Sequence, residues 1–333
     1  MDSAGANGAS FDEVFRQRTS ELRLAEGQSL MPFDVEAITN SKLGIRLLAS
    51  IAAKMPRAVG YRIADMVAWQ MARRRRSSIV RAVRGNQWVV RGENPASDGL
   101  DRAVHLTLQH SARSVFDLYH YIDNPEAVKP LVVLEPPLDE LVKRPEFADR
   151  GLLVSGVHTR SFDLLVRWFV LQGVKPLVLT LPDPRGARRL EYEMRRQIGM
   201  NLVPANVAGL RRAVRHLEQG GAVLTSVDFP VPRPRARPRF FGRPSALPVH
   251  HVFLATQARV PIVVMAPILE ADGKFHIKTS DFIEMDSRAG GGDGALRNAE
   301  LVLHTAEDII RRAPQQWSVP HPVWPSTLDM VPE

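Results

Sequence analysis

The stretch LLVSGVHTRSFDLLVRWFVL, residues 152–171, joins two hydrophobic patterns across one polar corner. Residues 152–157 form a short apolar run typical of a buried strand, whereas residues 162–171 have the apolar spacing of a helix. The corner between them carries His158, and Asp163 follows five residues later. The stretch therefore predicts a strand and a helix with a histidine exposed at the turn between them.

His158 is a candidate general base. A neutral imidazole takes a hydroxyl proton near neutral pH, and a carboxylate fixes its tautomer and stabilises the imidazolium that forms. Asp163 is one candidate for that carboxylate, and Asp228, at the end of another predicted strand, is a second. This pairing suits acyl transfer to an alcohol. The alternative is that the histidine and the acids only cap helices or support turns.

The pattern after residue 130 alternates short apolar runs with helical stretches. Seven runs predict strands, at residues 131–134, 152–157, 177–181, 201–203, 222–227, 262–268 and 275–279. Helices are predicted near residues 162–172, 187–198, 207–218, 248–258 and 294–312. Continuous apolar strands with helices on both faces indicate a three-layer α/β domain with a mixed, largely parallel sheet.

The N-terminal part predicts a helical hairpin over residues 41–72, broken at Met55-Pro56, and a third helix from Gly99 to about Tyr121. One apolar face of the hairpin consists of Leu43, Leu47, Leu48 and Ile51, and the other of Val59, Ile63, Met66 and Val67. Because arginines 73–76 follow directly, the hairpin is a candidate for lying on a membrane interface. Packing against the core is the alternative for most of these residues.

These patterns divide the chain into four parts. We expect a disordered tail at residues 1–30, a helical, membrane-associating region at residues 31–125, the α/β domain at residues 126–318, and a C-terminal tail at residues 319–333. Within the α/β domain, Gly220-Gly221 marks a turn.

The composition is that of a soluble globular protein, with 44% hydrophobic and 24% charged residues in a chain of 333. No apolar run reaches the roughly 18 residues needed to cross a bilayer, and residues 1–30 lack the apolar segment of a signal peptide. The absence of cysteine excludes disulfides, thiol nucleophiles and cysteine-bound metal. We therefore expect a cytoplasmic protein.

The net charge of +8 is concentrated in arginine clusters that attract phosphate. The phosphate could belong to nucleic acid, anionic lipid or an acyl carrier, and solvated helix faces are the alternative for each cluster. The clusters lie at Arg73–Arg76 with Arg81 and Arg84, at Arg185, Arg188, Arg189, Arg195 and Arg196, at Arg211, Arg212 and Arg215, and at Arg233, Arg235, Arg237, Arg239 and Arg243.

Two further segments are candidates for parts of the site. Arg195-Arg-Gln-Ile-Gly199 ends a predicted helix before a strand, where it could clamp a charged substrate group. Phe240-Phe241-Gly242 follows a loop rich in arginine and proline, and a simple core anchor is its alternative role. No GxGxxG or Walker-type loop is present, so nucleotide binding has no motif support.

Taken in order, these segments resemble the bacterial lipid A biosynthesis acyltransferase family, that is, the lauroyl and myristoyl acyltransferases and their phosphatidylinositol mannoside acyltransferase relatives. The resemblance runs from about Leu43 to Trp317. It rests on the basic stretch ending in Asn86, His158 and Asp163 as the H-x4-D/E element, Arg195 and Gly199 as the R-x-x-x-G element, Asp228 as the family's second acid, Phe240-Phe241-Gly242 as its FFG, and Pro314-Gln315-Gln316-Trp317 as its P-x-Q-W.

The resemblance implies a glycerolipid acyltransferase-like fold and an O-acyltransferase that takes a fatty acyl group from acyl-CoA or acyl carrier protein. The acceptor would be a hydroxyl of a glycolipid, with His158 as catalytic base and Asp228 or Asp163 as its partner acid. Arg160, Arg195, Phe241, Gly242 and Arg243 would bind substrate. It also implies a peripheral protein on an anionic surface, the cytoplasmic face of the inner membrane, with no cofactor, no metal and no nucleic acid.

The chain departs from the family pattern at two places. It reads Leu181-Pro182-Asp183-Pro184 where the family often has a glutamate, and Phe229-Pro230 follows Asp228 in place of a charged or polar pair. Neither departure changes the proposed base.

Two other functions compete with this interpretation. One is acylation of a glycerol phosphate lipid, although the proline-glutamate-glycine turn of that group is absent. The other is a non-catalytic binder of anionic lipid or nucleic acid, although aromatic residues of the stacking type are not interleaved with the arginines.

Overall fold

The computed structural model describes residues 50–93, 97–136, 150–181, 192–193, 195–197, 199–286 and 292–332. Its helices are α4 (Arg57–Ala72), α5 (Ser78–Val90), α6 (Ser97–His120), α8 (Phe162–Leu171), α10 (Val207–Glu218), α11 (His250–Ala258) and α12 (Gly292–Arg312), with 3-10 turns at Pro125–Leu131, Pro314–Gln316 and Pro325–Thr327. Its strands are β1 (Val132–Leu134), β2 (Leu152–Gly156), β3 (Leu177–Thr180), β4 (Asn201–Pro204), β5 (Ala222–Ser226), β6 (Arg239–Phe240), β7 (Arg243–Pro244), β8 (Ile262–Leu269) and β9 (Phe275–Thr279).

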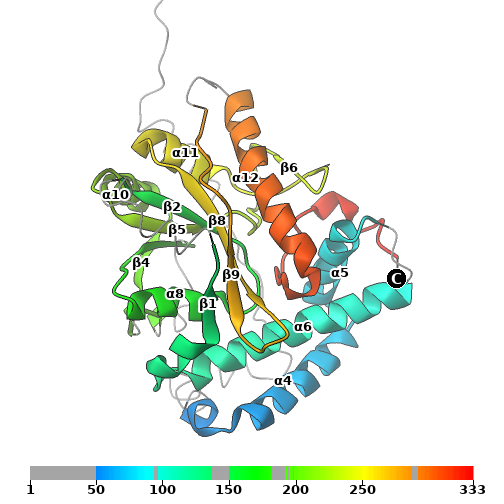
Figure 1. Cartoon of the computed structure of the whole chain (residues 1–333). Helices are drawn as coiled ribbons and strands as arrows, with labels where there is room; N and C mark the ends of the chain where they lie inside the picture. Colours follow the sequence, from blue (N-terminus) through cyan, green and yellow to red (C-terminus); the bar gives the residue numbers. More distant parts are fainter. Residues whose placement is uncertain are drawn as a thin grey trace, which may run out of the picture.

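Seven of the strands form one sheet in the order β1-β9-β8-β2-β5-β3-β4 (Figure 1). All neighbouring pairs are parallel except β8 and β9, which are antiparallel. These are the seven predicted strands, and their ends agree with the prediction to within about one residue. The mixed, largely parallel sheet is therefore confirmed. The short antiparallel pair β6–β7 was not predicted.

The sheet is the middle of three layers. Alternate residues of β2 face opposite sides: Leu153 packs in the main core with α10, α11 and α12, whereas Val154 packs with residues of α8. The main core includes Leu210 of α10, Leu254 of α11 and Val302 of α12, all at most 1% exposed. Strands buried on both faces explain why their sequences are continuously apolar. The α/β class with three layers is confirmed.

Helix α4 lies along α6 at one end of the molecule (Figure 1). The helix that ends before Pro56 is described only from residue 50, and Pro56 breaks it, as predicted. The inner side of α4 is lined by the small residues Gly60, Ala64 and Ala68. A Cβ at Gly60 would lie 2.1 Å from the ring of Phe116 on α6, so only glycine permits this close approach.

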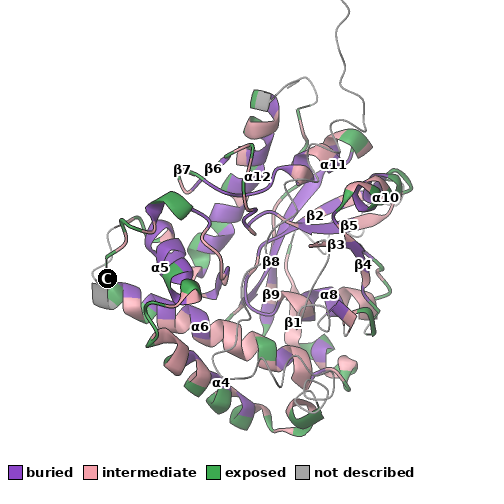
Figure 2. Cartoon of the chain, turned by 180° about the vertical axis from the view of Figure 1, so that it is seen from behind, coloured by how far each residue is buried: buried purple, intermediate pink, exposed green. Residues whose placement is uncertain are grey.

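The outer side of α4 carries an apolar stripe that consists of Val59, Ile63, Met66 and Trp69, each between 43% and 55% exposed. Figure 2 shows exposed positions along this helix, in contrast to the buried strands of the sheet. Val67, which we expected on the same face, is half-buried. None of the helices in the described part of the chain has the length and apolar character needed to cross a membrane.

Residues 319–332 were expected to form a tail, but they are packed into the domain. Val323 and Trp324 are 0% and 1% exposed. The segment is held by α5, a helix that we did not predict, because the buried Asn86 amide donates to the carbonyls of Val319 and His321 at 3.0 and 2.9 Å and accepts from Val323 N at 3.0 Å. The expected tail at residues 1–30, the first hairpin face up to Leu48, and Asp183 lie outside the described residues.

Candidate active site

The site forms where two neighbouring parallel strands end. Gly156 of β2 and Ser226 of β5 are partners in register, so His158 and Asp228, each two residues further on, meet at the same edge of the sheet. His158 Nδ1 lies 2.6 Å from Asp228 Oδ1, and the backbone N–H of His158 donates to Asp228 Oδ2 at 2.6 Å. The orienting acid is therefore Asp228, one of the two acids that the sequence offered.

Besides the two contacts with His158, Asp228 accepts a hydrogen bond from a tryptophan. Its side chain is 0% exposed, and Trp317 donates from Nε1 to Asp228 Oδ2 at 2.8 Å. A buried carboxylate is costly unless it accepts hydrogen bonds, and here three N–H groups or ring nitrogens face it. Because the acid is fixed, the imidazole that it contacts is fixed too.

The His158 ring is available to a substrate on one side. Its side chain is 36% exposed, and the rings of Phe162 and Phe229 stand 6.0 and 5.4 Å away, centroid to centroid. Because Nδ1 faces Asp228, Nε2 is the nitrogen that remains for an external proton. The ring is neither enclosed by packing nor fully in water.

The electrostatic surroundings raise the pKa of His158 above its usual value. Desolvation lowers this pKa, but the charge of Asp228 and the hydrogen bond to it raise it by more, so the net shift is upward. The charge of Asp163 adds to the rise and that of Arg195 opposes it.

Asp163 and Arg195 bind each other beside the histidine. Arg195 donates from Nε and Nη2 to the two carboxylate oxygens of Asp163 at 2.7 and 2.9 Å. This two-point contact joins the H-x4-D and R-x-x-x-G segments. Asp163 thus anchors an arginine at the start of α8 and makes no contact with His158 that would orient the ring.

Comparison with protein families identifies the family of the chain. The sequence model of the bacterial lipid A biosynthesis acyltransferases matches residues 33–326. The chain belongs to the bacterial lipid A biosynthesis acyltransferase family. No curated protein matches it. Membership makes the chain a lipid acyltransferase that acts in lipid biosynthesis, and it confirms the resemblance that the ordered motifs predicted.

The acyltransferase anchors the loop after β2 on several sides. Ser318 N donates to the carbonyl of His158 at 2.9 Å, and Thr159 Oγ1 donates to the carbonyl of Pro267 at 2.7 Å. Ser161 adopts φ 64°, a left-handed conformation that is uncommon for a residue with a side chain. Such backbone persists only where surrounding contacts determine it.

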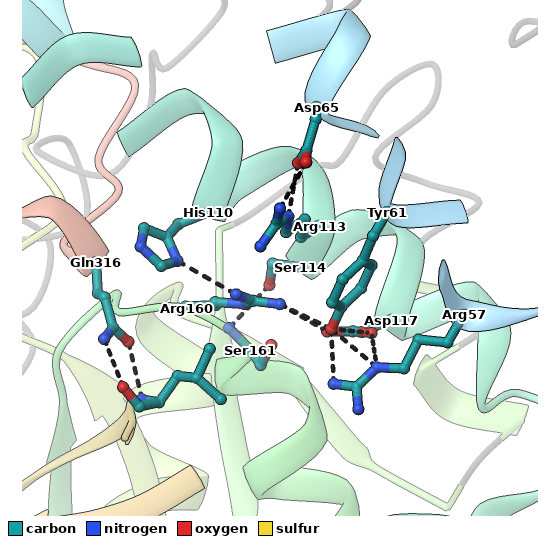
Figure 3. Close-up of polar contacts among 11 residues, drawn as sticks. Arg57, Tyr61, Asp65, His110, Arg113, Ser114, Asp117, Arg160, Ser161 and Gln316 are labelled. Carbon is teal, nitrogen blue, oxygen red and sulfur yellow. Dashed lines mark hydrogen bonds and ion pairs between the residues drawn. The ribbon is translucent and has the colours of Figure 1, made fainter. Parts of the chain in front are cut away.

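Arg160 is not accessible to a substrate of this acyltransferase. The residue is 1% exposed and donates to Tyr61 Oη at 2.8 Å, beside the buried Asp117 (Figure 3). The resemblance to the family implied that Arg160 binds substrate. The guanidinium instead points inward because its partners are supplied by α4 and α6.

Phe240 of the FFG segment is a core anchor of the acyltransferase. Phe240 is 0% exposed, stacks on Trp324 at 5.5 Å and meets Trp317 edge-on at 6.0 Å. Phe241 and Gly242 have positive φ values, and Arg243 forms an ion pair with Glu93. Phe241 meets Trp324 edge-on at 6.1 Å, whereas Gly242 is exposed, and the expected substrate-binding role of Phe241, Gly242 and Arg243 stays a prediction.

Three residues that sequence reasoning did not assign take part in the site. Trp317 donates to Asp228, and the rings of Phe162 and Phe229 flank His158. The P-x-Q-W motif was a signal for Trp317, and the unusual Phe229 after Asp228 was a signal for an apolar wall. Within the described residues, no group of three or more metal-ligating side chains comes together.

The raised pKa of His158 predicts the pH dependence of the acyltransferase. If His158 acts as a general base, it must be unprotonated, so kcat/KM should be low at acid pH and rise through the histidine pKa. Because that pKa is raised, the midpoint of the rise should lie above 6.5, the ordinary value for histidine. Measuring kcat/KM from pH 5 to 9 with palmitoyl-CoA checks this. A rate that is independent of pH, or a midpoint below 6.5, would contradict it.

Proposed function

We propose that this lipid acyltransferase moves a fatty acyl group from an acyl thioester to a hydroxyl of a glycolipid, with His158 as general base. The observation that carries the proposal is the 2.6 Å contact of His158 Nδ1 with the buried Asp228, which leaves the partly exposed ring to accept a proton at Nε2. That arrangement is what proton abstraction from an alcohol requires.

The reaction is a direct displacement. Nε2 of His158 takes the acceptor's hydroxyl proton as the oxygen forms a bond to the thioester carbonyl carbon. The carbon–sulfur bond then breaks, and the imidazolium returns the proton to the leaving thiolate. The products are an ester and a free thiol. Asp228 stabilises the imidazolium between the two proton transfers and keeps Nδ1 protonated.

The donor in this proposal is acyl-CoA or acyl carrier protein, both of which carry phosphate. The loop that leaves the site after Phe229 carries exposed arginines that suit those phosphates, Arg233, Arg235, Arg237 and Arg239. Arg195, beside Asp163, is a further candidate for a charged group of the substrate.

The location in this proposal is peripheral, on the cytoplasmic face of the inner membrane, where both a soluble thioester and a lipid acceptor are accessible. The apolar stripe of α4 supports it, because Arg62 and Arg73–Arg76 are largely exposed on or next to the same helix. Apolar residues flanked by arginines favour an anionic lipid surface. The Arg73 guanidinium lies 4.5 Å from the centre of the Trp69 ring, so charge and apolar surface are contiguous.

Replacing Ile63 and Met66 together by serine should weaken binding to vesicles of phosphatidylglycerol and phosphatidylcholine by at least about tenfold, since each apolar side chain is worth up to about 1.5–3 kcal/mol on burial. Co-sedimentation measures the change. Leu301→Ser is the matched control, because Leu301 is 50% exposed but lies on α12. Equal binding by the double variant and wild type would contradict the assignment of this face.

The proposed function is tested by incubating the protein with isotope-labelled palmitoyl-CoA and a bacterial lipid extract, and identifying the labelled product by mass spectrometry. A labelled glycolipid that carries one additional ester supports the proposal. A labelled glycerophosphate lipid as the sole product would show that the acceptor is a phospholipid precursor instead. Labelled product formed equally by His158→Ala would refute the general-base role.

A further inference from the structure

Arg160 is a buried charge next to the catalytic residue. It lies two residues after His158 and is 1% exposed, and its ion-pair partner Asp117 is 0% exposed. Burying such charges costs several kcal/mol per ion unless they are paired and hydrogen-bonded. The buried Arg160–Asp117 pair beside the proposed general base therefore requires further hydrogen bonds to stabilise it.

The hydroxyl of Tyr61 connects the buried charges (Figure 3). It donates to the carboxylate of Asp117 at 2.8 Å and accepts from Arg160 Nη2 at 2.8 Å and from Arg57 Nη2 at 2.6 Å. The direct contact of Arg160 with Asp117 is longer, 3.4 Å, so the hydroxyl is the closer partner of both. Burial and the charge of Asp117 raise the pKa of Tyr61, so that the hydroxyl keeps its proton.

His110 completes the surroundings of the guanidinium. Burial, together with the charges of Arg160 and Arg113, lowers the pKa of His110 to about 4, so the ring is neutral near pH 7. A neutral imidazole is an acceptor, and Arg160 Nη1 lies 3.3 Å from His110 Nδ1. The guanidinium is thus held by groups from both α4 and α6.

Helix α6 also contacts the backbone of the loop. Ser114 of α6 accepts a hydrogen bond from Ser161 N at 2.8 Å, at the residue with the left-handed conformation. Arg160 and Ser161 are consecutive and follow His158-Thr159. Their contacts therefore fix the backbone of the loop between the general base and the start of α8.

We propose that Tyr61, Asp117 and Arg160 form a positioning cluster that sets the placement of His158 and ties the catalytic loop to helix α4, whose outer stripe faces the lipid. The inference rests on the proposed function. Tyr61 lies on the inner side of the helix that carries Ile63 and Met66 outward, so a single helix bears both the lipid-facing surface and the support of the loop.

The variant Tyr61→Phe tests the cluster with the smallest change. It keeps the ring and removes the hydroxyl, which leaves Arg160 and Asp117 only their longer direct contact of 3.4 Å. A small misplacement of a catalytic group costs up to about 10²-fold, so kcat should fall by roughly 10- to 100-fold. The KM for palmitoyl-CoA and binding to phosphatidylglycerol vesicles should stay within about twofold of wild type, because neither surface changes.

Asp65→Asn is the matched control. Asp65 also joins α4 to α6, through a two-point ion pair with Arg113 whose Nε contact is 2.6 Å, but it does not contact the loop. This variant should weaken the helix packing, seen as a lower Tm, and leave kcat within about twofold. If Tyr61→Phe and Asp65→Asn change kcat equally, the cluster is ordinary packing and the proposal is overturned.

A double-mutant comparison gives a second readout. The double variant Arg160→Gln/Tyr61→Phe should have the same kcat as Arg160→Gln alone, because both substitutions disrupt the same cluster. The losses in kcat of Arg160→Gln and Asp65→Asn should instead add in their double variant. Additive losses for the first pair would overturn the proposal. If Arg160→Gln does not fold, the comparison of Tyr61→Phe with Asp65→Asn decides. Unchanged turnover of His158→Ala would instead refute the proposed function, whatever Tyr61→Phe does.

Discussion

His158→Ala is expected to lower the turnover of acyl thioester by about 10² to 10⁴, the usual contribution of general base catalysis. The variant removes the nitrogen that takes the acceptor's proton in the proposed mechanism and leaves the approach between Phe162 and Phe229 open. KM should change little, because the imidazole acts in the transition state and not in holding the acyl chain. Release of free CoA from palmitoyl-CoA in the presence of lipid acceptor measures the loss.

The control for this variant is His304→Ala. The His304 side chain is 70% exposed on α12 and contacts Glu307, so its removal should leave the rate unchanged. Circular dichroism should show that both variants are folded, since the His158 side chain is itself 36% exposed and leaves no closed cavity. Turnover of His158→Ala within about threefold of wild type would exclude the histidine as the base, because the loss expected for that role is far larger.

Asp228→Asn is expected to have the second large effect, also about 10² to 10⁴ in kcat, the size seen when the acid of a histidine–acid pair is made neutral. The amide offers one acceptor oxygen and an NH2 group that would face other donors, among them His158 N and Trp317 Nε1. The tautomer of the ring is then no longer fixed, and the imidazolium loses its counter-charge. The pKa of His158 should fall, so the residual rate should reach its plateau at lower pH than wild type.

Asp163→Asn is the control for this variant, because it removes the other candidate acid and leaves Asp228 in place. Asp163 binds Arg195 and adds only a longer-range charge to His158, so its removal should cost less than Asp228→Asn. Parallel measurements of kcat and of the pH midpoint distinguish the two. Equal losses, or a greater loss for Asp163→Asn, would mean that the orienting acid has been assigned to the wrong residue.

The strands of the domain were predictable because both faces of the sheet are covered. The central strand β8 is continuously apolar over its whole length, whereas β9 alternates apolar and polar residues, and both patterns indicate strands. All seven strands were recognised in this way. Helix α5 was not recognised because its buried side includes Asn86 and Gln87, which interrupt the apolar spacing. Their partners, the carbonyls of Val319, His321 and Pro314, lie more than 220 residues away and cannot be read from local sequence.

The site was predictable in part, because apolar strands mark where its residues lie. His158 and Asp228 follow apolar runs that end at one edge, but the sequence does not state that β2 and β5 are neighbours, so the choice between Asp228 and Asp163 stayed open. Arginines were read as exposed phosphate ligands. For Arg160 that interpretation failed, because its partner Tyr61 is 99 residues distant and turns the side chain toward the protein. Arg243 is paired with Glu93, 150 residues distant, but stays partly exposed, so its role stays a prediction.

The proposed mechanism requires a neutral His158 ring with its proton on Nδ1 beside Asp228 and its lone pair on Nε2. Nuclear magnetic resonance of protein labelled with 15N-histidine, titrated with pH and assigned by comparison with His158→Ala, observes both nitrogens directly. We expect the Nδ1–H tautomer at high pH and a titration midpoint above 6.5 that coincides with the midpoint of kcat/KM. An Nε2–H tautomer, or a midpoint that differs from the kinetic one, would contradict the account.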